Sequence, residues 1–260
     1  MDIATVGGLV GGVFLMFFGV VVNGLSPLQI MDPASAIITF GGGACATIVA
    51  GSMSRLFNVP KFSKFAIFPR HADTAQLILT LVQFSERARR EGLLSLEDDL
   101  ANLDEPFLKK GIQLVVDGTD PELVRNILET DMQNIRNRHS EGSTFWGDLG
   151  FFLPAFGMLG TLIGLIQMLL SLSTGDPNAI GKGMSAALIT TLYGSFGSNL
   201  VALPLQKKLL LRDGDEYVVK AIMIEGILSI QSGDNPRIVK DKLSSFLPPA
   251  DRGALDEAGV

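Results

Sequence analysis

Hydrophobic residues along this chain are gathered into four long stretches that carry no ionisable side chain. They cover residues 3–25, 34–53, 149–173 and 183–205. A helix that crosses the hydrocarbon core of a bilayer needs about 20 consecutive apolar residues. The pattern therefore predicts four transmembrane helices. No basic residue precedes the first stretch and no small-x-small cleavage site follows it, so we expect it to be retained rather than removed as a signal peptide.

The lack of intramembrane charge limits what this chain can do alone. Proteins that move ions through a membrane usually keep an acidic or basic side chain inside it. The polar residues of the four stretches are mainly Thr, Ser, Asn and Tyr. If the chain conducts ions, we expect a partner to bring the charged group.

Basic residues mark one side of the predicted membrane region. The connections 26–33 and 174–182 hold Lys182 as their only Lys or Arg. The other flanks carry Arg55, Lys61, Lys64, Arg70, Arg136, Arg138, Lys207, Lys208 and Arg212. Because Lys and Arg accumulate on the cytoplasmic side, both termini and the long segment between spans two and three are predicted to be cytoplasmic.

The segment between spans two and three shows helical periodicity. A capping pair at Asp73 and Gln76 precedes apolar residues at helical spacing, and Gly92 ends that helix. Ser95 is expected to cap a short helix that reaches about Leu103. A further helix is predicted over residues 106–116.

The longest helix is expected to begin at the sequence Asp120-Pro121-Glu122, which combines an N-cap, a proline at the first helical position and an acidic first turn. It is predicted to reach span three with a break near Gly142. Span four is expected to continue as a helix over 207–230, followed by a short helix from Pro236. The tail from Pro248 is predicted to be disordered.

These elements predict an all-α integral membrane protein without strands. We divide it into spans one and two at 1–54, a helical cytoplasmic domain at 55–146, spans three and four at 147–206, and cytoplasmic helices with a tail at 207–260.

Composition narrows the function further. With a net charge of −6 and a pI near 5.0, the chain is not expected to bind nucleic acid. A single cysteine, Cys45, and two histidines argue against a disulfide framework and a zinc site. No nucleophile–base arrangement is evident, so we expect neither an enzyme nor a cofactor.

Small and hydroxyl-bearing residues run along the spans. In span three, Pro154, Gly157, Thr161 and Gly164 share a face, and in span four so do Ala187, Thr191, Ser195, Ser198 and Ala202. Such faces allow close helix packing, either within one four-helix unit or between subunits of a ring. The hydroxyls of Thr161 and Thr191 could bind a sodium ion, or could bond carbonyls of their own helix. Thr190 lies one residue off this face.

Two prolines, Pro154 and Pro204, lie near the predicted cytoplasmic ends of spans three and four. A proline removes one backbone hydrogen bond and can bend a helix. Both residues are therefore either tolerated membrane prolines or hinges that let the cytoplasmic part move.

Several segments resemble the MotA/PomA family of flagellar stator subunits. The span-four sequence Ala-Leu-Ile-Thr-Thr-Leu-Tyr-Gly-Ser-Phe at 187–196, followed by Pro204, resembles the family's signature block. Residues 153–165 resemble its third span, and Arg-Arg-Glu-Gly-Leu-Leu-Ser-Leu-Glu at 89–97 resembles its charged cytoplasmic segment. The resemblance covers nearly the whole chain up to about residue 248.

The resemblance implies a ring, usually a pentamer, around a dimeric MotB/PomB-type partner whose single span carries an Asp. Ion flow would turn this ring in the lipid membrane of the bacterial cell, and the ring's cytoplasmic rim would push the rotor protein FliG. An ExbB/TolQ-type energiser of the outer membrane and a stand-alone channel are the alternatives.

The resemblance also implies residue roles. It assigns rotor contact to Arg89, Arg90 and Glu97. Arg87, Asp98 and Asp99 are expected to add to the same charged surface. Pro154 and Pro204 match the prolines tied to torque. Thr161, Thr191 and, less directly, Thr190 match the hydroxyls of the sodium-driven branch, where proton-driven members tend to have Ala at the place of Thr161. Sodium is thus the expected coupling ion, with the proton as alternative.

Overall fold

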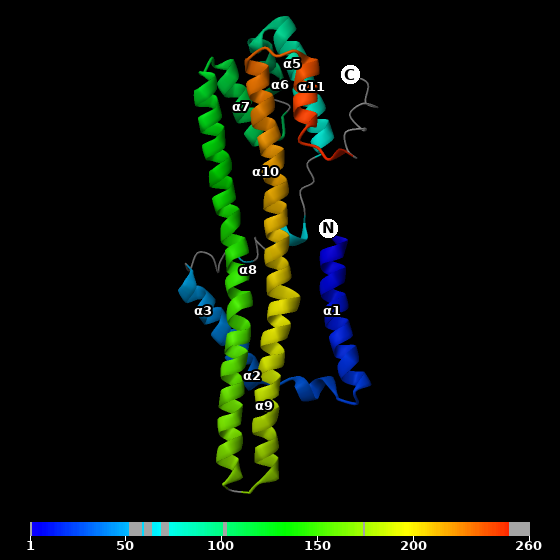
Figure 1. Cartoon of the computed structure of the whole chain (residues 1–260), viewed down its shortest axis with the longest axis vertical. Helices are drawn as coiled ribbons and strands as arrows, with labels where there is room; N and C mark the ends of the chain where they lie inside the picture. Colours follow the sequence, from blue (N-terminus) through cyan, green and yellow to red (C-terminus); the bar gives the residue numbers. More distant parts are fainter. Residues whose placement is uncertain are drawn as a thin grey trace. The chain divides into compact units, whose positions relative to one another are not determined.

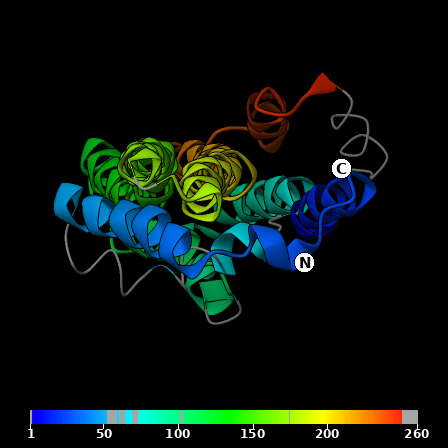
Figure 2. The same cartoon turned by 90° about the horizontal axis from the view of Figure 1, so that it is seen from below.

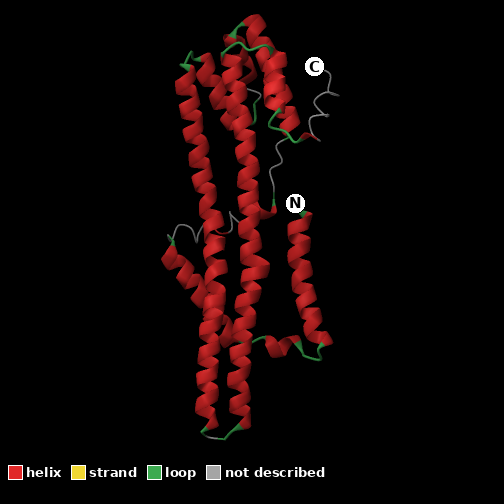
Figure 3. Cartoon of the chain, viewed as in Figure 1, coloured by secondary structure: helices red, strands yellow, loops and turns green. Residues whose placement is uncertain are grey.

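The computed structural model describes residues 2–51, 59, 64–68, 73–100, 103–173 and 175–249, and all of the regular structure in these ranges is helical (Figure 3). The chain forms two compact units. Unit 1 comprises Met1–Pro69 and His139–Arg212, and unit 2 comprises Arg70–Arg138 and Asp213–Val260. The borders at 138/139 and 212/213 fall inside two long helices, which each contribute residues to both units.

Four helices in the described part of the chain are long and apolar enough to span a membrane, as predicted. The first is α1 (Ile3–Val22), which Asp2 caps by accepting a hydrogen bond from the Thr5 amide. A short 3₁₀ turn, η1 (Pro27–Ile30), leads to the second span. This second span is built from α2 (Pro33–Ala36), a π-helical turn η2 (Ile37–Gly41) and α3 (Gly42–Ala50).

The third and fourth spans belong to much longer helices. Helix α8 (Pro121–Leu172) is continuous, and the predicted break near Gly142 is absent. A glycine costs only about 1 kcal/mol in a helix interior, and here the helix continues through it. Helix α9 (Pro177–Phe196) passes through a π-helical turn, η4 (Gly197–Ala202), into α10 (Leu203–Gln231).

Glycines allow α8 and α9 to lie side by side in unit 1 (Figures 1 and 2). A Cβ added at Gly164 would lie 2.6 Å from the Ala187 nitrogen, and one at Gly183 would lie 2.7 Å from the Met168 nitrogen. These glycines therefore serve packing within the subunit. By contrast, added Cβ atoms at Gly7, Gly8, Gly11, Gly19 and Gly41 would meet nothing within 4 Å.

Unit 2 is a helical bundle with its own apolar core. It contains α5 (Thr74–Glu91), η3 (Leu93–Leu96), α6 (Glu97–Leu100), α7 (Pro106–Val116) and α11 (Pro236–Ser244), together with parts of α8 and α10. Fully buried members of the core include Ile78, Leu81, Leu96, Ile112, Leu128, Ile222, Ile227 and Leu243.

The helix starts and stops in unit 2 follow the predictions closely. Asp73 caps α5 through the Gln76 amide, and Gly92 ends it with φ +87°. Asp120 and Asn235 cap α8 and α11 in the same way. Ser95 differs from its predicted role, because it lies inside η3, where its hydroxyl donates to the Gly92 carbonyl. The predicted tail falls mostly at 250–260, outside the described residues.

Candidate functional site

Three threonine hydroxyls converge on one backbone oxygen where α8 meets α9. The Ala187 carbonyl oxygen lies 3.0 Å from Thr161 Oγ1, 2.9 Å from Thr190 Oγ1 and 3.4 Å from Thr191 Oγ1. Thr161 Oγ1 and Thr191 Oγ1 are 2.5 Å apart, and Thr161 also reaches the Gly157 carbonyl at 3.1 Å. The structure therefore brings the predicted pair together and adds Thr190 to it. We call Thr161, Thr190, Thr191 and the Ala187 carbonyl the hydroxyl cluster.

The position of Thr190 corrects the predicted face of span four. Thr190 is 1% exposed, and its side chain packs against Gly160 of α8, whereas Thr191 and Ser195 are exposed. The buried face of α9 contains Gly183, Ala187, Thr190 and Gly194, and it continues through Gly197, Ser198 and Ala202 of the π turn. The hydroxyl cluster therefore has one buried side and one side open to the surface of the subunit.

A proline and a serine are matched across the two helices. Pro154 lies inside α8 and has no N–H to offer the carbonyl of Gly150, four residues earlier. The Ser198 hydroxyl donates to that Gly150 oxygen at 2.6 Å, and Ser198 is 2% exposed. The serine of η4 thus replaces the bond that the proline removes. Pro204 is exposed and is the second residue of α10, with Leu203 between it and the π turn.

The predicted rotor-contacting charges are all in unit 2, at the end of α5 and in α6. Arg89, Arg90, Glu97 and Asp98 are exposed. The Arg90 guanidinium is 70% exposed and lies 3.6 Å from Glu86, which makes only a weak surface pair. These charges are consequently available to a partner.

Arg87 has a different environment from its neighbours. Its guanidinium lies 3.2 Å from Glu91 and 2.7 Å from Asp99. The hydrogen bond to Glu91, followed by the charge of Asp99, raises the pKa of Arg87. Arg87 and Asp99 therefore join α5 to α6 and hold the charged surface in place, instead of standing free in it.

A second charge cluster holds the start of span one. Asp2 lies 2.5 Å from Lys208 Nζ and 2.9 Å from the Arg212 guanidinium, which also donates to the Phe65 carbonyl. The Lys208 bond is the main reason why the pKa of Asp2 is well below its usual range. These two basic residues follow span four in sequence, so the cluster ties the N-terminus to the end of that span.

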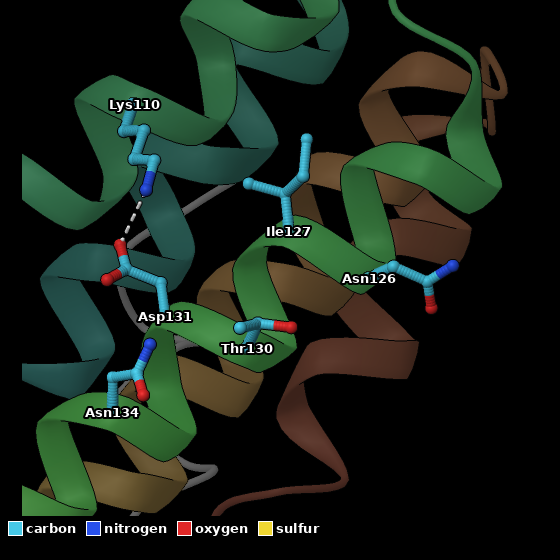
Figure 4. A pocket seen from close by; sticks show the side chains of 6 residues that line it. All are labelled: Lys110, Asn126, Ile127, Thr130, Asp131 and Asn134. Atoms are coloured by element: carbon cyan, nitrogen blue, oxygen red, sulfur yellow. Dashed lines mark hydrogen bonds and ion pairs between the residues drawn. The ribbon is translucent and has the colours of Figure 1, made fainter.

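A shallow pocket in unit 2 lies between α7 and α8. Figure 4 shows Lys110 reaching toward Asp131, and their charged atoms are 2.9 Å apart. The other residues that line it are Asn126, Ile127, Thr130 and Asn134. Because the two charges neutralise each other, the pocket offers no strong anchor for a charged ligand. Within the described part of the chain, no group of three or more His, Cys, Asp or Glu side chains could hold a metal ion.

The fold and this site define a class of protein: a four-span α-helical membrane protein with a neutral, hydroxyl-bearing contact between its third and fourth spans. Residues 99–218 match the MotA/TolQ/ExbB proton channel family. The chain is 43% identical to motility protein A of Borreliella burgdorferi, over 87% of this chain and 86% of that protein. It is 36% identical to chemotaxis protein PomA of Vibrio alginolyticus, over 99% and 100% of the two chains.

The solved structures agree with the sequence comparison. The flagellar MotAB stator complex from Bacillus subtilis contains a chain that superposes with a TM-score of 0.88 at 30% identity, covering 96% of this chain and 98% of that one. The chain therefore belongs to the MotA/TolQ/ExbB family, and within it to the MotA/PomA stator subunits.

Proposed function

We propose that this chain is the ring-forming subunit of a flagellar stator. With a MotB/PomB-type partner it forms a sodium channel in the bacterial inner membrane and converts ion flow into torque on FliG. In this proposal both termini and unit 2 are cytoplasmic. The Lys and Arg residues that flank the spans lie in the segments joined to them, and such residues accumulate on the cytoplasmic side of a membrane.

The hydroxyl cluster carries the proposal of sodium coupling. It gathers three hydroxyl oxygens around one carbonyl oxygen, with 2.9–3.4 Å between each hydroxyl and that carbonyl. Neutral, hard oxygen ligands of this kind suit a small hydrated cation such as sodium. A hydroxyl does not titrate near neutral pH, so the cluster is a poor proton relay. The carboxylate that completes the pathway is the intramembrane Asp of the partner.

Exposed apolar side chains on the spans support an oligomer. Phe151 of α8 is 73% exposed, Leu170 is 69% exposed and Leu188 of α9 is 63% exposed in the single chain. In the assembly we propose, a pentameric ring, these faces are covered by neighbouring subunits, by the partner's span and by lipid.

The exposed charges at the end of α5 and in α6 form the proposed rotor-binding surface. Arg89 and Arg90 supply the basic part, and Glu97 and Asp98 supply the acidic part. Solvent-exposed charges of both signs mainly set the specificity and rate of association. FliG binding should therefore weaken as ionic strength rises.

Swimming speed at fixed proton gradient tests the coupling ion. Cells that carry this chain and its partner as their only stator are moved through decreasing external sodium chloride, with potassium chloride replacing it. We expect speed to fall with sodium. Unchanged speed without sodium would make the proton the coupling ion and leave the stator assignment standing.

Co-purification tests the motor role against the ExbB/TolQ alternative. A tagged chain in native membranes should retain FliG together with its MotB/PomB-type partner, and Arg89→Glu combined with Arg90→Glu should reduce the FliG recovered. Recovery of an outer-membrane energy-coupling protein in place of FliG would favour the alternative.

A further inference from the structure

Tyr193 connects span four to the start of span two through a single hydroxyl. Its oxygen donates to the Ile30 carbonyl at 2.6 Å and accepts from the Asp32 amide at 3.0 Å. Ile30 ends η1, and Asp32 caps α2 by accepting from the Ser35 amide at 2.9 Å. The hydroxyl therefore bonds to both sides of the turn that precedes the second span.

Further contacts continue this connection along span two. The rings of Phe40 and Tyr193 stack with their centroids 5.6 Å apart. Thr39, which is fully buried, directs its hydroxyl toward the Thr190 carbonyl at 3.4 Å. The turn of α9 from Thr190 to Tyr193 is thus held on one side by span two.

The same turn is held on its other side by α8. Thr190 packs against Gly160, and Thr161 bonds the Ala187 carbonyl at 3.0 Å. The hydroxyl cluster consequently depends on two supports, α8 and span two. Ligand groups that are held in place before an ion arrives lose less freedom when they bind it.

We propose that Tyr193 is a positioning residue for the hydroxyl cluster: its hydroxyl fastens the start of span two to span four and so keeps the Thr190–Thr191 turn pressed against α8. This inference rests on the proposed ion pathway. Tyr193 does not touch the ion; it sets the geometry of the groups that do.

Tyr193→Phe removes this hydroxyl and leaves the ring on Phe40. Two hydrogen bonds are lost, and only part of this loss reaches the ion affinity, because Tyr193 acts through the backbone of α9 and does not touch the ion. We expect the sodium concentration for half-maximal swimming speed to rise about threefold to tenfold, while the speed at saturating sodium stays near that of wild type. The measurement is speed against external sodium chloride in cells whose only stator is this chain with its partner.

Tyr217→Phe is the matched control. Tyr217 is 40% exposed, and its ring lies beneath the Arg136 guanidinium at 5.1 Å. Removing its hydroxyl leaves that ring contact in place, so the half-maximal sodium concentration should not move. Counting a fluorescently labelled partner at the flagellar base shows whether either variant changes stator assembly.

Two results would overturn the inference. One is an unchanged half-maximal sodium concentration in Tyr193→Phe. The other is a fall in saturating speed and in stator number without a shift of the midpoint, which would make Tyr193 structural only. A wild-type motor whose speed ignores sodium would instead overturn the proposed coupling ion, on which this inference rests, whereas an unchanged midpoint in a sodium-dependent motor overturns the inference alone.

Discussion

The carbonyl oxygen of Ala187 collects more hydrogen-bonding partners than an ordinary helix carbonyl. Three threonine side chains approach it, one from α8 and two from α9. These bonds satisfy the hydroxyls inside an otherwise apolar region. The same oxygens can turn toward a cation, because each hydroxyl has lone pairs to offer.

Replacing Thr161 by alanine tests the proposal that the hydroxyl cluster binds the coupling ion. The change removes one oxygen from the cluster and leaves the helix backbone intact. Loss of about 1.4 kcal/mol of ion affinity would raise the half-maximal sodium concentration for swimming about tenfold. Thr161→Ser, which keeps the hydroxyl, should stay close to wild type. A wild-type sodium response in Thr161→Ala would show that Thr161 is not part of the ion pathway.

Among the helices, Ser198 compensates for Pro154. The serine hydroxyl of η4 bonds the Gly150 carbonyl that the proline leaves without its usual partner. This bond joins the third span to the π turn of the fourth, which ends two residues before Pro204. Both prolines follow this contact in sequence, Pro154 four residues after Gly150 and Pro204 six residues after Ser198.

Ser198→Ala should destabilise the protein because it leaves a buried carbonyl without a partner. The expected loss is about 1–3 kcal/mol of unfolding free energy. Ser195→Ala is the control, since Ser195 is exposed on the same span and its change should cost less than about 0.5 kcal/mol. Denaturant unfolding of the detergent-solubilised chain measures both. Equal effects of the two changes would contradict the role given to Ser198.

The close approach of α8 and α9 yields a second prediction for these helices. Gly164→Ala would place its Cβ 2.6 Å from the backbone of α9, so the helices must move apart. Overpacking of this kind costs about 1–3 kcal/mol. Gly181→Ala, where an added Cβ meets nothing within 4 Å, should be neutral or stabilising. Thermal unfolding in detergent compares the two, and a stable Gly164→Ala variant would show that the interface can adjust.

For the whole molecule, the absence of charge in the four predicted stretches is the dominant fact. The stretches 3–25, 34–53, 149–173 and 183–205 contain no Asp, Glu, Lys, Arg or His. A sodium ion that crosses a bilayer unaided by a charged or filter-like group faces a high desolvation cost. We therefore expect the chain to conduct ions only together with its partner.

Purified chain reconstituted into vesicles should pass no sodium under an imposed sodium gradient. An internal sodium-sensitive dye reports the flux, and a sodium ionophore added at the end confirms that the gradient was intact. Sodium flux above that of protein-free vesicles, in the absence of any partner, would contradict the proposal that the partner supplies the charged group needed for conduction.

Local patterns in the sequence were enough to predict the four spans and most helix starts. The four spans follow from apolar length, and Asp73, Asp120 and Asn235 identify helix starts because each side chain satisfies free amides of its own first turn. The break expected near Gly142 was wrong: α8 continues through this residue, because one glycine costs only about 1 kcal/mol in a helix interior. Matched motifs were sufficient to identify the MotA/PomA family.

Contacts between distant residues were decided only by the tertiary structure. Helical spacing placed Thr191 on the packed face and left Thr190 off it, whereas Thr190 is the buried residue. The π turn at Gly197–Ala202 keeps Ser198 and Ala202 on the buried face of the fourth span. The local sequence pattern did not predict this turn. Likewise, Tyr193 is ordinary in sequence and gains its role from Ile30 and Asp32, which lie more than 160 residues away. Periodicity reports what each helix can bury, but which partner it meets depends on how the helices pack.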